Sequence, residues 1–263
     1  MSQETLEGWA DEDDTLPETC LSFELRGEWG HFRRVEGNIV KQTYRIIPRT
    51  TVAGLVAAVL GLERDSYYEA FGPEVSSIAV EAIEELRTIN LPQNTLSTAK
   101  EHMTTMPSRG HARISMPDPT KLRQQHNYEV LVEPAYRVDL RLANDELRTR
   151  FRDHLRNGTA YYPPSLGLSE HLAEITYLGE FDVTPRERET TEVDSAVLEA
   201  VDNVELAPET EIKVERSPAF MAADEDGRTT TAFQSIAYAT RTEPILVQNV
   251  ETHEVDGRRV MFS

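Results

Sequence analysis

The sequence predicts an α+β fold, in which a ferredoxin-like βαββαβ unit is followed by a smaller β-rich part. Apolar residues alternate with polar ones over 20–26, recur with a helical period over 50–62, and alternate again over 128–142. Strand candidates at 76–83 and 85–91 lie between these segments. This succession of strands and helices is close to that of the split βαββαβ motif.

The first half of this unit is a strand followed by a helix. Apolar side chains occupy every second position of 20–26, which is typical of a half-buried strand. The helix predicted over 50–62 has its apolar residues at i, i+3, i+4, i+7 and i+8, and Thr50 or Thr51 is expected to cap its N-terminus. Its remaining residues are small, so it can lie close to a sheet.

The second half repeats this order. The long strand predicted over 128–142 is interrupted at Pro134. Asn144 is the expected N-cap of the next helix, which Asn157-Gly158 ends. A further strand is predicted over 171–181.

These elements divide the chain into an acidic tail (1–19), a main domain (20–181) and an acidic linker with a β-rich C-terminal subdomain (182–263). Within the main domain, residues 90–126 have no sustained periodicity and contain four prolines, and a connection of that length is usually functional or disordered. The acidic stretch 182–226 is expected to be a solvated loop region or an insertion.

A type I′ hairpin turn is predicted near the C-terminal end. The dipeptide Asp256-Gly257 separates two short strand-like runs there, and such a turn needs two residues with positive φ.

The composition is acidic and poor in lysine. The chain has 46 Asp and Glu against 27 Lys and Arg, a formal net charge of −19, and its lysines are Lys41, Lys100, Lys121 and Lys213. Carboxylates remain hydrated in molar salt, so this surface predicts a protein of a halophile, with an ordinary acidic protein as the alternative. The single cysteine, the lack of a secretory signal and the lack of a long apolar run predict a cytoplasmic protein without a membrane partner.

Two stretches are locally basic despite this net charge, namely residues 21–60 and 90–126. The first contains the run W-G-H-F-R-R, and Arg49 lies just before a predicted helix N-terminus, where an anion is favoured. The aromatic residues Trp29, Phe32 and Tyr44 could stack on bases. Nucleic-acid binding is one interpretation; in the other, these rings pack in the core and the arginines pair with acids of the same chain.

Motifs for nucleotide, zinc-protease or serine-hydrolase chemistry are absent from the sequence. His102, His111 and His126 lack a ligand-like spacing, so we expect neither a metal site nor a cofactor.

The sequence resembles the fifth family of CRISPR-associated (Cas) proteins of the RAMP superfamily, in particular its type I-B, haloarchaeal branch. The residues that carry the resemblance are L-S-F-E-L-R-G-E-W-G-H-F-R-R, K-Q-T-Y-R-I-I-P-R-T-T-V-A-G-L-V-A-A-V-L-G and Y-Y-P-P-S-L-G-L-S-E-H-L-A-E-I-T-Y-L-G. The resemblance implies an RRM-like domain whose residues near 90–126 form a thumb-like hairpin. It also implies a subunit of the Cascade interference complex that caps the 5′ handle of the crRNA, beside the backbone and large subunits and with only indirect contact to target DNA.

The resemblance and the two basic stretches together define a set of expected RNA-binding residues. These are Trp29, Phe32, Arg33, Arg34, Lys41, Tyr44, Arg45, Arg49, Gly54, Arg109, Arg113, Lys121, Arg123 and His126.

A catalytic role is not expected. Relatives of type I-C cut precursor RNA with a Tyr, a Lys and a His, and the resemblance matches Tyr44 and His126 to two of these positions but leaves Gln125 where the Lys would stand. Without that cation, charge on the phosphate lacks a partner. A metal-independent endoribonuclease and a protein–protein scaffold that makes no RNA contact remain the alternatives.

Overall fold

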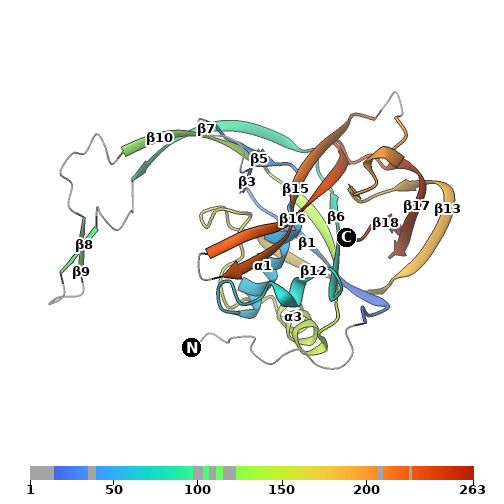
Figure 1. Ribbon diagram of the computed structural model, residues 1–263, viewed down its shortest axis with the longest axis horizontal. Coiled ribbons are helices and arrows are strands. Elements are labelled where there is room, and N and C mark those ends of the chain that lie inside the picture. Colours follow the sequence, from blue (N-terminus) through green and yellow to red (C-terminus); the bar gives the residue numbers. More distant parts are fainter. Residues whose placement is uncertain are drawn as a thin grey trace.

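The computed structural model describes residues 15–34, 40–96, 103–106, 111–114, 123–206, 210–224 and 227–263, and within β8, β9 and the distal ends of β7 and β10 it describes the backbone alone. The fold is mixed α/β, built mostly from strands (Figure 1). The helices among the described residues are α1 (Arg49–Leu60) and α3 (Asp145–Asn157), with the 3-10 turns η1 (Glu69–Phe71) and η3 (Val201–Asn203). None of the helices described is long and apolar enough to cross a membrane.

The centre of the molecule is a four-stranded antiparallel sheet in the order β12-β1-β11-β6. Its strands are β1 (Thr19–Arg26), β6 (Ser76–Ala82), β11 (Ala135–Leu142) and β12 (Glu174–Asp182). Along the chain α1 lies between β1 and β6, and α3 lies between β11 and β12.

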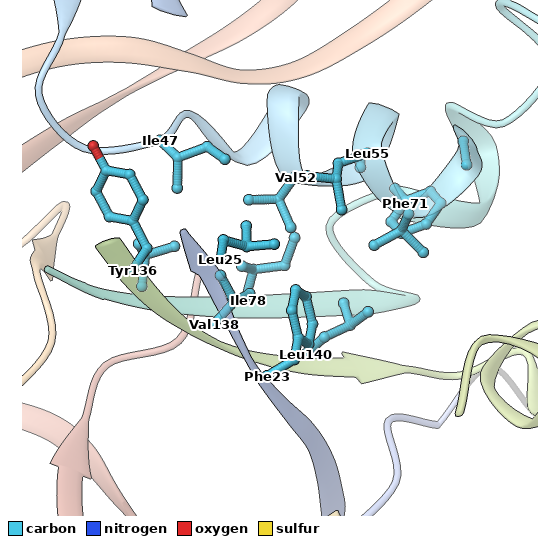
Figure 2. Close-up of a cluster of buried hydrophobic side chains, with 14 of the residues drawn as sticks. Phe23, Leu25, Ile47, Val52, Leu55, Phe71, Ile78, Tyr136, Val138 and Leu140 are labelled. Carbon is cyan, nitrogen blue, oxygen red and sulfur yellow. The ribbon is translucent and has the colours of Figure 1, made fainter. Parts of the chain in front are cut away.

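Both helices cover the same face of this sheet, where the main core lies. Figure 2 shows the side chains of α1, among them Val52 and Leu55, against those of the sheet. Phe23 of β1 meets Phe151 of α3 edge to face, with ring centroids 5.4 Å apart, and Val52 of α1 packs in the same cluster. The alternation that predicts β1 therefore turns its apolar residues toward the helices.

The predicted ends of the helices agree with the structure except at one cap. The Asn144 side chain accepts a hydrogen bond from the Leu147 N–H, and Gly158 ends α3 in the left-handed conformation. For α1 the prediction of a threonine cap is wrong. The N-cap is Pro48, which makes no side-chain cap, because Thr50 and Thr51 already lie inside the first turn.

Two further sheets follow the central one. One has the order β13-β17-β18, with β13 (Thr184–Val193), β17 (Ile245–Val255) and β18 (Arg258–Val260); the other has the order β14-β16-β15, with β14 (Val197–Leu198), β16 (Gly227–Ala239) and β15 (Ile212–Asp224). The predicted turn between β17 and β18 is confirmed, because Asp256 and Gly257 have φ of 51° and 74°.

The expectation of a solvated loop over 182–226 is wrong, because β13, β14 and β15 lie there. Glu187, Glu189 and Glu192 of β13 are exposed, whereas Glu215 of β15 is buried together with Ser217 and Ala219 on one side of that strand. A count of charge does not distinguish such a strand from a loop.

A two-stranded ribbon extends away from the rest of the molecule (Figure 1). It consists of β7 (Arg87–Leu96) and β10 (Arg123–Val132), which pair antiparallel along their whole length, and we call it the arm. The short strands β8 (Met103–Met106) and β9 (His111–Ile114) lie between β7 and β10 in the sequence and pair with each other. The predicted thumb region 90–126 thus contains the distal parts of β7 and β10 together with β8 and β9.

Candidate nucleic-acid interface

The basic segment 29–49 wraps around the base of the arm as four short strands. These are β2 (Trp29–Gly30), β3 (Phe32–Arg33), β4 (Val40–Lys41) and β5 (Thr43–Tyr44). Strands β2 and β4 pair with β10, and β3 pairs with β5. The expected RNA-binding residues on these four strands therefore lie close to the arm, but on different sides of it.

One face of the arm brings together an aromatic ring, an imidazole and a lysine. Tyr128 is directly opposite Leu91, His126 is opposite Gln93, and Lys41 is the parallel partner of Tyr128. Directly paired residues point to the same side of a sheet, and side chains alternate along each strand. We call Lys41, Leu91, Gln93, His126 and Tyr128 the arm face.

The arm face is suited to stacking. All five side chains are partly exposed. The ring of Tyr128 lies between two imidazoles, with centroids 6.3 Å from His126 and 5.1 Å from His31. Aromatic rings on an open strand pair are the usual platform for single-stranded bases, and Lys41 adds a cation for a phosphate.

A loop over residues 163–173 packs against His31, whose ring contacts Tyr128 of the arm face. The His31 N–H donates to the Leu166 carbonyl at 3.0 Å, and Gly167, with φ of 94°, is so close that a Cβ there would be 2.0 Å from the His31 carbonyl oxygen. The His31 ring pairs through Nδ1 with the Glu129 carbonyl oxygen at 2.8 Å. Burial lowers the pKa of His31 below its ordinary value, although the hydrogen bond to the Glu129 carbonyl opposes this, so the neutral ring is favoured at pH 7.

The opposite side of β10 carries a carboxylate that binds Arg45. Nη2 of Arg45 donates to Oε1 of Glu129 at 2.7 Å and Nη1 donates to Oε2 at 3.2 Å, while the Thr43 N–H donates to the same carboxylate. Burial by itself would raise the pKa of Glu129, but the hydrogen bonds and charge of Arg45 outweigh it and hold that pKa below its ordinary value. Arg45, expected to bind RNA, is thus occupied by an acid of the same chain.

Arg49 departs further from the expectation. Its guanidinium is buried, donates to the hydroxyl and carbonyl of Ser76 at 2.6 and 2.9 Å and to the Ser263 carbonyl at 2.6 Å, and lies over the ring of Phe220. Burial lowers its pKa to about 10. A side chain with these partners has no surface for a phosphate, so we remove Arg49 from the RNA-binding set.

Two of the expected stacking rings are also inside the molecule. Phe32 is 2% and Tyr44 is 4% exposed; Phe32 packs against Tyr136, and the guanidinium of Arg34 covers the Tyr44 ring at 5.4 Å. Gly54 lies in α1, where a Cβ would be 3.1 Å from the Tyr67 hydroxyl, so its small size serves packing. Of the two interpretations that the sequence left open, packing in the core is therefore the correct one for Phe32 and Tyr44.

The other expected residues have different positions. Arg33 is exposed on β3, and Trp29 is half-buried opposite Val132 at the base of the arm. The backbones of Arg113 and Arg123 lie in β9 and β10, whereas Arg109 and Lys121 lie outside the described residues.

Sequence reasoning missed Tyr128 and His31. The signal for Tyr128 was present, because it stands two residues after His126 in an alternating strand and must share its face. Nothing local indicates the role of His31, which depends on the loop at 163–173. In the part of the chain that the structure describes, no three His, Cys, Asp or Glu side chains gather to hold a metal ion.

Comparisons with known proteins place the chain in a family. The sequence profile of the CRISPR-associated protein (Cas_Cas5) family matches residues 20–241. A search of curated proteins found no match.

Solved structures of low sequence identity are also similar. A CRISPR protein from Archaeoglobus fulgidus is 15% identical, with a TM-score of 0.49 over 92% of this chain and 97% of that one. A chain of a CRISPR RNA-guided surveillance complex is 14% identical, with a TM-score of 0.47 over 86% and 91% of the two chains. The family match, which covers most of the sequence, is the decisive one: this chain belongs to the CRISPR-associated Cas5 family.

Proposed function

We propose that this chain is the non-catalytic subunit of a type I CRISPR Cascade complex that binds the 5′ handle of the crRNA through the arm face. The observation that carries the proposal is the face itself, which combines Tyr128, His126 and Lys41 on an exposed strand pair in a chain whose net charge is −19. Membership of the Cas5 family supports the same class of ligand. The partners are the backbone and large subunits, with target DNA reached only through them, in the cytoplasm of a halophile of the type I-B branch.

We infer that the central domain is ferredoxin-like and RRM-like. Numbered within the βαββαβ unit, the strands β1, β6, β11 and β12 stand in the spatial order 4-1-3-2, with a helix after the first and third strands. The arm is then an extension of the hairpin between the second and third strands of that unit.

The absence of cleavage is supported by the positions of the three matched residues. Tyr44 is buried beneath Arg34. Gln125 and His126 are neighbours on β10, so their side chains point to opposite faces of the arm. A Lys at position 125 would therefore not lie beside the imidazole, and the set does not converge on one phosphate.

RNA binding is testable with single substitutions on the arm face. Fluorescence anisotropy with labelled repeat RNA in 1–3 M KCl should show that Tyr128→Ala weakens binding by ~1–3 kcal/mol, the usual contribution of one stacked base. Lys41→Ala should weaken binding less at this salt and reduce the log–log salt slope by roughly 0.7. The RNA should remain uncut without divalent metal.

Matched controls are available elsewhere on the surface. Tyr162 is 39% exposed, and Arg188 is exposed on β13 without an ion pair among the described residues. Tyr162→Ala and Arg188→Ala should leave the affinity unchanged. Wild-type affinity in Tyr128→Ala would contradict the assignment of the arm face, and a specific RNA product lost in Tyr44→Phe would favour the endoribonuclease.

A further inference from the structure

Arg45 occupies a junction between three parts of the chain. Its side chain forms the bidentate pair with Glu129 of β10, and its Nη1 also donates to the Thr43 carbonyl at 2.9 Å. Its backbone follows β5 and leads into α1. The guanidinium therefore connects the base of the arm to the start of the main helix.

The backbone of Arg45 is held as firmly as its side chain. The N–H groups of Arg45 and Ile46 donate to the buried carboxylate of Glu215 on β15, at 3.0–3.2 Å, and the Tyr136 hydroxyl donates to the Arg45 carbonyl at 2.5 Å. In Figure 2 the Tyr136 hydroxyl points away from the apolar cluster, toward the segment before α1. We call Arg45, Glu129, Tyr136 and Glu215 the Arg45 clamp.

The clamp acts where the arm leaves the body. Toward the body, the next residues of β10 after Glu129 are the buried Val130 and Leu131; toward the tip, Asn127 is already exposed. Two-stranded ribbons are marginal by themselves, so the contacts at their base determine their direction. Glu129 also immediately follows Tyr128, whose side chain points to the other face of β10.

We propose that Arg45 is a positioning residue, which orients the arm face through Glu129 and links that orientation to the β15–β16 hairpin through Glu215, rather than an RNA ligand. This inference rests on the proposed function for its effect on RNA, but its effect on the arm can be measured without RNA. The side chains of Arg45 and Glu129 are 25% and 19% exposed, and the guanidinium and the carboxylate bind each other.

Glu129→Gln distinguishes the two roles of Arg45 by the sign of its effect. If Arg45 bound a phosphate, removal of the competing carboxylate would leave the affinity for repeat RNA unchanged or raise it. If Arg45 positions the arm, the affinity falls, by about five- to tenfold for a coupling of ordinary size. The matched control is Glu180→Gln, since Glu180 pairs with Arg152 at similar exposure but on the central sheet.

Hydrogen exchange of the RNA-free protein provides the independent readout. In Glu129→Gln, backbone amides of 87–96 and 123–132 should exchange faster, while those of β1 and β11 remain unchanged. Equal exchange in the arms of wild type and Glu129→Gln would overturn the positioning role. If wild type itself fails to bind RNA, the proposed function fails, while this exchange result still decides the clamp.

The reversed pair completes the test. Arg45→Glu alone should both weaken RNA binding and loosen the arm, and the double variant Arg45→Glu with Glu129→Arg should recover most of both. Recovery of slow exchange in the double variant without recovery of affinity would show that the Arg45 cation itself touches RNA, which would overturn the proposal.

Discussion

The central sheet and the arm are both built from long antiparallel strands, yet they are held in place differently. Along β1 and β11 most side chains are buried, on the helix side by α1 and α3 and on the other side by β17 and β18. In the arm, β7 has no fully buried position among those described, and β10 is buried only near its base. The sheet is stabilised by apolar burial, and the arm by its backbone ladder and the polar clamp at its base.

This difference separates stability from ligand binding. Burial on both faces excludes the sheet from ligand contact. The arm keeps its aromatic and basic groups accessible, and it therefore has few buried contacts. Substitutions in the sheet should therefore lower the free energy of unfolding, and substitutions on the arm should change RNA affinity with the fold intact.

The largest effect should come from the core. Phe151 is fully buried against Phe23, so Phe151→Ala should lower the free energy of unfolding by about 3–5 kcal/mol. Urea denaturation at fixed KCl concentration measures this change. A loss below about 1 kcal/mol would mean that the helix face of the sheet is not the core described above.

Removal of the buried guanidinium should be the next largest change. Arg49→Ala removes one donor from the Ser76 carbonyl and one from the Ser263 carbonyl, which keeps the Ile78 N–H, and we expect a loss of about 2–3 kcal/mol of unfolding free energy. Its RNA affinity, measured where the variant is folded, should equal that of wild type. A stable Arg49→Ala variant with weakened RNA binding would restore the expectation from sequence.

A smaller effect concerns pH. Burial lowers the pKa of both His31 and His171 from the ordinary 6.5. Below about pH 6.5 the unfolded chain takes up protons that the folded chain does not, so stability falls as the pH drops toward the lowered values, by at most about 1.4 kcal/mol per pH unit for each histidine. Urea midpoints between pH 7.5 and 5 should decline less steeply in His31→Gln, and an unchanged slope would contradict this account.

The smallest effect on stability should come from the arm. Ile89 is 41% exposed, so Ile89→Ala should change the free energy of unfolding by less than about 0.5 kcal/mol, in the same assay as Phe151→Ala. A loss comparable with that of Phe151→Ala would show that the arm shares the core of the body and would remove the distinction drawn here.

Several elements could be predicted because their signals are local. The alternation of 20–26, the Asn144 cap and the Asp256-Gly257 turn each depend on residues within a few positions of one another, and the structure has all three. The prediction of a threonine cap for α1 was equally local but wrong, because the helix begins at Arg49, directly after Pro48.

The fate of the arginines could not be predicted in this way. Arg45 lies 84 residues before Glu129 and 170 before Glu215, and Arg49 donates to Ser263, 214 residues away. A charge count over 21–60 treats these arginines as an unpaired cluster, because their acidic and carbonyl partners lie far away in the sequence and meet them only in the folded chain. The role of His31 could not be predicted for the same reason, because the loop at 163–173 that covers it is distant in sequence.

Cross-linking of 4-thiouridine-labelled repeat RNA to the protein, followed by peptide mapping, tests most directly whether the arm face binds RNA. The account predicts adducts on the peptides that contain His126 and Tyr128 and on the one that contains Lys41, and their loss in Tyr128→Ala but not in Tyr162→Ala. Adducts confined to α3 or to the β15–β16 hairpin, with the arm peptides unmodified, would contradict it.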